Sequence, residues 1–243
     1  MSTSTNMNKD KDKNMSIHTA LIIGAARGIG REMVQQYLAD GWRVIATARS
    51  DEQCAALAAI GAQALPLDVT SASSITAFGR QLSDALLNDA SLDAAWLVPG
   101  LYGPRHDDAP SEAEFDAVMH TNVLAAMRLL PLLGPMVAAA RGTLAVLSSR
   151  MGSIGTRNAS NGSLYRASKA ALNSVLVDAG IAFGPQGATC VAVHPGWVRT
   201  DMGGAGADLA VEASVAGLRA TLARLSAADN GSFVDYDGTP IPW

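Results

Sequence analysis

The chain has 243 residues, of which 49% are hydrophobic, 16% are charged and 5% are aromatic. This composition excludes an intrinsically disordered chain and predicts a folded protein with a sizeable core. The formal net charge of -4 and the shortage of aromatic residues argue against a nucleic-acid-binding protein. The sequence contains no uninterrupted run of about 20 apolar residues, so it predicts no membrane-spanning helix. We therefore expect neither a nucleic acid nor a membrane as a partner.

The first 16 residues are polar and lack the apolar segment of a signal peptide, so we expect 1–16 to be a disordered leader. Residues 17–243 are expected to form a single domain. The two cysteines, Cys54 and Cys190, lie far apart in the sequence and are typical of unpaired thiols in a reducing compartment. This pattern favours a cytoplasmic location. The four histidines show no ligand spacing, so no metal site is predicted.

Short apolar runs alternate with helical patterns from residue 18 onward. Strands are predicted at 20–23, 42–47, 63–67, 92–98, 143–147, 189–193 and 232–236. Helices are predicted at 28–39, 50–59, 71–87, 111–130, 163–183 and 211–225, with Pro131 and Pro135 expected to disturb the end of the fourth. This alternation predicts an α/β fold, a single Rossmann-type doubly wound parallel sheet of about seven strands with helices on both faces.

Three glycines, Gly24, Gly28 and Gly30, lie between the first predicted strand and the first helix, and Arg27 and Ile29 lie among them. Glycine lets the backbone turn sharply and approach a pyrophosphate, which the free N–H groups of the helix start then bind. A purely structural turn is the alternative. The place of this loop in the first strand-to-helix connection nevertheless favours nucleotide binding.

The end of the second strand indicates which nicotinamide cofactor would bind. A carboxylate usually stands here in NAD-binding proteins, but Ala48 provides none. Arg27 and Arg49 instead offer cations to a 2′-phosphate, although both could equally be solvated surface side chains. The pattern favours NADP (NADPH) over NAD, and an NAD-specific alcohol dehydrogenase remains an alternative.

Tyr165 and Lys169 are four residues apart in a predicted helix and therefore share one of its faces. A nearby ammonium lowers the pKa of a phenol from about 10, which suits proton transfer to a carbonyl oxygen as a hydride reaches the carbon. Ser148 and Ser149 follow the fifth strand and can hydrogen-bond to the same oxygen. Alone, the Tyr–Lys spacing is common on solvated helices, but the glycine loop upstream makes it specific.

These motifs together resemble the short-chain dehydrogenase/reductase family, from His18 to Trp243. The resemblance implies an NAD(P)-dependent oxidoreductase in which Ser149 orients the substrate carbonyl and Tyr165 is the general acid and base. Lys169 would bind the nicotinamide ribose and tune Tyr165, and Asn122 would hold a proton-relaying water. It also implies a set of cofactor-binding residues, namely Gly24, Arg27, Gly28, Ile29, Gly30, Arg49, Asp68, Val69, Gly100, Tyr165, Lys169, Pro195, Gly196, Val198 and Thr200.

Two segments refine this resemblance. Residues 194–204 and 236–243 look like the C-factor-like, carbonyl-reductase-related branch of the family. The family's Asn-Asn-Ala-Gly, however, is replaced by Leu97-Val98-Pro99-Gly100, and Pro99 lacks a backbone donor. We expect the chemistry to survive and the cofactor's affinity or position to change. Ser148 and Ser153 are alternatives to Ser149.

The substrate is expected to be a small, apolar carbonyl compound or alcohol. The enzyme is expected to be an NADPH-dependent carbonyl reductase. Six mostly apolar residues fall on loops at the carboxyl ends of the strands, namely Leu101, Tyr102, Met151, Ile154, Trp197 and Met202. The alternative is a non-catalytic, nucleotide-sensing or signalling protein of the C-factor-like kind. The family resemblance also favours a homodimer.

Overall fold

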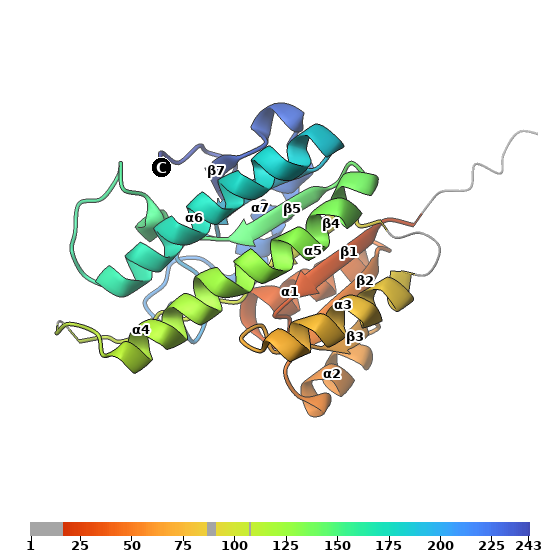
Figure 1. Cartoon of the computed structure of the whole chain (residues 1–243), viewed down its shortest axis with the longest axis horizontal. Helices are drawn as coiled ribbons and strands as arrows, with labels where there is room; N and C mark the ends of the chain where they lie inside the picture. Colours follow the sequence, from red (N-terminus) through yellow and green to blue (C-terminus); the bar gives the residue numbers. More distant parts are fainter. Residues whose placement is uncertain (1–16, 87–90, 107) are drawn as a thin grey trace, which may run out of the picture.

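The computed structural model describes residues 17–86, 91–106 and 108–243, so the expected leader at 1–16 lies outside the described residues. Seven parallel strands form one sheet in the order β3-β2-β1-β4-β5-β6-β7 (Figure 1). Their bounds are β1 Thr19–Ile23, β2 Arg43–Ala48, β3 Gln63–Pro66, β4 Ala94–Leu97, β5 Thr143–Leu147, β6 Thr189–His194 and β7 Ser232–Asp235. The order reverses at β1 and β4, which confirms the predicted doubly wound fold.

Helices cover both faces of the sheet because its central strands are apolar on both sides. Leu21 and Ile23 of β1 pack into one core cluster and Ala20 and Ile22 into the other. Figure 1 shows α3, α5 and α6 together on one face. Their bounds are Ala72–Leu86, Ala125–Ala139 and Ser163–Phe183, and the other face carries α1 Gly28–Ala39, α2 Asp51–Ala58 and α7 Val211–Leu222. Every predicted element is present, with ends shifted by a few residues.

The fourth predicted helix departs from expectation in two ways. It starts as α4, Glu112–Met119, widens into a π-helical turn at His120–Leu124 and continues as α5. The prediction that Pro131 and Pro135 disturb its end is wrong, because α5 contains both and runs on to Ala139. Both prolines are exposed and four residues apart, so the hydrogen bonds that they cannot donate lie on the solvent side, where water can bind the carbonyls.

The run Glu112–Ala139 is long and apolar enough to resemble a membrane span. However, 56% of its most apolar window is buried inside the molecule, and α5 residues such as Leu129 and Val137 belong to the core beneath α6. Core helices commonly have this composition, so the run is better explained by packing against the sheet.

Candidate active site

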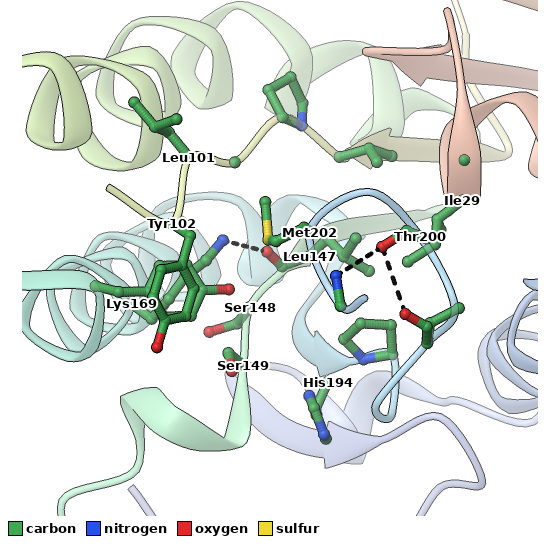
Figure 2. A pocket seen from close by; sticks show the side chains of 18 of the residues that line it. Ile29, Leu101, Tyr102, Leu147, Ser148, Ser149, Lys169, His194, Thr200 and Met202 are labelled. Atoms are coloured by element: carbon green, nitrogen blue, oxygen red, sulfur yellow. Dashed lines mark hydrogen bonds between the residues drawn. The ribbon is translucent and has the colours of Figure 1, made fainter. Parts of the chain in front are cut away.

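A cleft of about 1400 Å³ lies at the carboxyl ends of the strands. All fifteen residues expected to bind the cofactor line it, as do Ser148 and Ser149. Figure 2 shows how the two ends differ: Tyr102, Lys169, Ser148 and Ser149 lie at one end, and Ile29 and Thr200 at the other. Asn122 does not line the cleft but lies buried behind its wall. The structure thus brings the glycine loop and the Tyr–Lys pair into one pocket.

The glycine loop is shaped by close contacts that exclude side chains. A methyl group at Gly30 would overlap the carbonyl oxygen of Gly24, and one at Gly24 would lie 2.8 Å from the Pro99 ring. Gly24 has a φ of 84°, which favours glycine. Its N–H donates to Thr47 Oγ1 over 3.1 Å. Sequence analysis missed this role of Thr47, although a hydroxyl at the end of the strand beside β1 was a usable signal.

The two arginines at the cofactor end differ in their partners. Arg27 forms an ion pair with Asp201, and both side chains are more than three-quarters exposed. Such an exposed pair contributes little to stability, so an anionic ligand can compete for Arg27. Arg49 forms no ion pair within the described part of the chain. Ala48 is buried and places no carboxylate near either guanidinium.

Asp68 also lines the cleft, and its carboxylate accepts hydrogen bonds from within the loop after β3. The side-chain hydroxyl and the backbone N–H of Thr70 both donate to Asp68 Oδ1. These hydrogen bonds lower the pKa of Asp68, and the charge of Arg49 lowers it further. Val69 is buried next to it and lines the cleft. The loop after β3 thus presents a charged oxygen and an apolar side chain to the same end of the pocket.

Tyr165 lies in the first turn of α6 and is 7% exposed. Its ring stacks on that of Tyr102 with centroids 4.8 Å apart, and Lys169 Nζ is 5.7 Å from its centroid. Burial raises the pKa of Tyr165 to about 12, and a side-chain hydrogen bond with Ser149 opposes this rise. The pKa of Tyr165 is therefore raised rather than lowered as the sequence led us to expect, and the phenol keeps its proton at neutral pH.

Lys169 is one helical turn beyond Tyr165 and is fully enclosed. Its Nζ donates to the carbonyl oxygen of Leu147, the last residue of β5, over 2.7 Å. Burial lowers the pKa of this ammonium to about 8, because a charged group is disfavoured away from water. The side chain therefore holds a proton at neutral pH that it can lose in mildly alkaline solution.

The three candidate serines differ in their hydrogen bonds. Ser148 Oγ donates to Asn173 Oδ1 over 2.5 Å inside the core. Ser153 Oγ donates to the carbonyl of Pro242 over 2.6 Å and accepts from Thr156 N–H. Ser149 is the one of the three that is hydrogen-bonded to Tyr165. The hydroxyls of Ser148 and Ser153 donate to structural partners, whereas Ser149 Oγ accepts from the Met151 N–H over 3.2 Å and still interacts with the phenol.

Asn122 fixes the segment that departs from the family pattern. It lies in the π-helical turn, accepts from Leu101 N–H over 2.7 Å and donates to the Leu101 carbonyl over 2.8 Å. Its amide also donates to Ser168 Oγ on α6 over 2.8 Å. The Val98 N–H still donates to the Ile23 carbonyl at the carboxyl ends of the central strands β4 and β1, although Pro99 follows it. The segment 98–101 is therefore tied to β1 and α6 without the family's asparagines.

The substrate side of the cleft, around Tyr102 and Tyr165, has a mixed lining. Five of the six expected substrate-side residues line it, namely Leu101, Tyr102, Met151, Trp197 and Met202. Ile154 does not line it and is 74% exposed. Sequence analysis missed the C-terminal segment 240–242, which lines the cleft. Ser153 Oγ donates to its Pro242 carbonyl, and Gly155 N–H donates to the carbonyl of the following Trp243. Within the described residues, no three His, Cys, Asp or Glu side chains are grouped as metal ligands.

Comparison with known proteins identifies the family. The family described as short chain dehydrogenase matches residues 18–208. This chain is a short-chain dehydrogenase. The chicken fatty-liver carbonyl reductase, solved with NADPH bound, superimposes with a TM-score of 0.86 at 29% identity, covering 93% of this chain and 94% of that one. A Pseudomonas aeruginosa carbonyl reductase solved with NADP gives 0.80 at 34% identity, covering 94% and 100%.

Another relative of this short-chain dehydrogenase has a name that describes no reductase. The C-signal protein of Myxococcus xanthus is 33% identical over 161 residues, which are 66% of this chain and 92% of that protein. The solved neighbours are nevertheless carbonyl reductases, and the chain belongs to the branch of the family related to them. The family assignment makes it an oxidoreductase that acts on a small molecule.

The hydrogen bonds of Asn122 predict its contribution to stability. Asn122→Ala leaves both backbone groups of Leu101 and the Ser168 hydroxyl without this partner, so unfolding should become easier by about 2–5 kcal/mol. Urea unfolding measures this change. Asn158→Ala is the matched control, because Asn158 is exposed at the same cleft and should change the free energy of unfolding by less than about 0.5 kcal/mol. Equal stability of the two variants would contradict the assignment.

Proposed function

We propose that this short-chain dehydrogenase is an NADPH-dependent carbonyl reductase. The observation that carries the proposal is the meeting of Ser149, Tyr165 and Lys169 at one end of a cleft whose other end is the glycine loop. The carbonyl reductases with which it superimposes support this activity, since their structures were solved with NADPH or NADP. The substrate would be a ketone or an aldehyde bound next to Tyr165.

The lining residues fit a bound NADPH. The N–H groups at the start of α1 would hold the pyrophosphate, because the glycines leave that backbone open to close approach. Arg27 and Arg49 would hold the 2′-phosphate, because Ala48 at the end of β2 provides no carboxylate for a ribose hydroxyl. The remaining contacts follow the family resemblance: Asp68 and Val69 at the adenine, Lys169 at the nicotinamide ribose, and Gly100, Pro195, Gly196, Val198 and Thr200 around the nicotinamide. When bound, NADPH supplies the hydride that reaches the carbonyl carbon.

Residues of the chain itself supply the proton that the carbonyl oxygen gains. Ser149 Oγ hydrogen-bonds to the substrate's carbonyl oxygen, and Tyr165 donates its phenolic proton to that oxygen as the alcohol forms. The pKa of Tyr165, about 12, ensures that the phenol is protonated at neutral pH and ready to donate. The ammonium of Lys169 stabilises the phenolate that remains, and its buried position strengthens this attraction.

The nucleotide-sensing alternative is not favoured. Its main support is the similarity to C-signal. Nucleotide binding alone gives no role to a buried tyrosine phenol beside a serine hydroxyl, whereas carbonyl reduction uses both. Here Tyr165 and Ser149 both line the cleft.

Removal of the Tyr165 hydroxyl tests the proton donor. Tyr165→Phe should lower kcat for aldehyde reduction by about 10²- to 10⁴-fold, because proton transfer to the carbonyl oxygen is lost. Its affinity for NADPH, measured by fluorescence titration, should be little changed. Ser153→Ala is the control and should keep its turnover, since that hydroxyl bonds to Pro242. Full turnover by Tyr165→Phe would refute the mechanism.

The two arginines at the cofactor end test cofactor preference. Arg27→Ala and Arg49→Ala should each raise the Kd for NADPH by about 10- to 100-fold, through the loss of charge-assisted hydrogen bonds to the 2′-phosphate. Binding of NADH, which lacks this phosphate, should hardly change in either variant. Arg31→Ala on α1 is the control, because Arg31 does not line the cleft. A parallel loss of NADH binding would instead indicate damage to the loop.

The pH dependence of reduction should report on Lys169. Its pKa of about 8 means that the ammonium is charged below pH 8 and neutral above it. We therefore expect kcat/KM for reduction to be level below about pH 8 and to fall about tenfold per pH unit above it. NADPH binding measured at each pH separates this effect from a change in cofactor affinity. A level profile up to pH 10 would show that the charge on Lys169 is not needed.

A further inference from the structure

Two arginines at the substrate end of the cleft have no carboxylate partner among the residues that the structure describes. Arg105 and Arg166 both line the cleft, and neither takes part in any of the ion pairs formed by the described residues. By contrast, Arg27 and Arg150, which also line it, are paired with Asp201 and Asp235. Arg105 and Arg166 therefore bring two guanidinium charges to the substrate end that pair with no carboxylate of the described residues.

Arg105 is placed one aromatic ring away from the proposed proton donor. Its guanidinium carbon lies 4.8 Å from the centroid of the Tyr102 ring, and that ring stacks on Tyr165 at a further 4.8 Å. Tyr102 is confined from the other side too, because a methyl group at Gly162 would lie 2.6 Å from its hydroxyl oxygen. The order Arg105, Tyr102, Tyr165 is thus fixed by packing.

Most N–H donors of the Arg105 guanidinium have no hydrogen-bond partner among the described residues. Within the described part of the chain its one hydrogen bond runs from Nη2 to the Met202 carbonyl, over 2.9 Å. A guanidinium has five N–H donors, so most of them remain for a ligand. The planar fork suits a carboxylate, which can accept two parallel hydrogen bonds from it. The bond to Met202 also holds the fork at the cleft.

Arg166 contributes charge but few free donors. Its guanidinium bonds to the backbone oxygen and the side-chain oxygen of Asn161 and, over 3.5 Å, to the Met151 carbonyl. Glu114 is bonded to His106 and Ser111 and does not line the cleft. Arg166 thus adds a charge to the cleft, and Arg105 is the one of these two arginines with most of its donors left for a ligand.

We propose that the substrate is a carbonyl compound that carries a carboxylate about one aromatic ring away from its carbonyl group. Its carbonyl would lie at Tyr165 and Ser149, its apolar middle along Tyr102 and Met151, and its carboxylate on Arg105. This inference rests on the proposed function, because it places the reacting carbonyl at Tyr165. It also goes beyond the purely apolar substrate expected from the sequence.

A matched pair of aldehydes tests the proposal. 4-Carboxybenzaldehyde has one ring between its aldehyde and its carboxylate, and methyl 4-formylbenzoate is its uncharged ester. The readout is the ratio of kcat/KM for the acid to that for the ester, with NADPH. Wild type should prefer the acid, and Arg105→Gln should lower this ratio by about 10- to 100-fold. Arg105→Lys should restore part of it, since it returns the charge without the fork.

Arg157→Gln is the control for a general electrostatic effect. Arg157 lies on a neighbouring loop, bonds to the Ala159 carbonyl and does not line the cleft, so the ratio should stay at the wild-type value. A wild-type ratio of one or less, or a ratio that Arg105→Gln leaves unchanged, overturns the inference while carbonyl reduction stands.

Binding separates the two claims if neither aldehyde is reduced. Terephthalate, which is not reducible in this assay, is titrated by calorimetry into the NADPH-saturated wild type and Arg105→Gln. Binding that weakens about tenfold or more in the variant supports the carboxylate site even though the proposed function has failed. Binding that is absent from both proteins overturns the carboxylate site as well.

Discussion

The hydrogen bond from the Lys169 ammonium to the Leu147 carbonyl is the constraint around which the site is built. It joins α6 to the end of β5 in a place that water does not reach. Tyr165 lies one turn earlier on the same helix, and Ser149 lies two residues beyond Leu147. A single buried contact therefore fixes the relative positions of Ser149, Tyr165 and Lys169, the three residues of the proposed catalytic set. A charged group buried in this way must be well partnered to be tolerated.

The buried side-chain amide of Asn122 makes a second set of hydrogen bonds between distant segments. It binds the backbone of Leu101 on one side and Ser168 on the other, and Ser168 lies next to Lys169. The loop after β4 is thereby drawn so close that a methyl group at Gly100 would lie 3.4 Å from Lys169 Nζ. The amide of Asn122 thus holds this loop although the family's asparagines before Gly100 are replaced here.

Much of the fold and the core of the site could be predicted from local sequence, because their signals are local. The glycine loop and the Tyr165–Lys169 spacing each lie within a few residues, and buried parallel strands are continuously apolar. The stacking of Tyr102 on Tyr165 and the choice among the three serines depend on contacts between distant segments. The continuity of α5 through Pro131 depended on which face the prolines occupy, and the raised pKa of Tyr165 on the depth of its burial.

The most direct measurement of the proposed activity is a single-turnover reaction with the wild-type protein. A known amount of NADPH is bound by an excess of protein and mixed with a panel of aldehydes and ketones. Both the loss of reduced-cofactor absorbance and the alcohol formed are measured. We expect one alcohol to appear for each NADPH consumed with at least one member of the panel. Tight binding of NADPH with no consumption across the whole panel would contradict a carbonyl reductase.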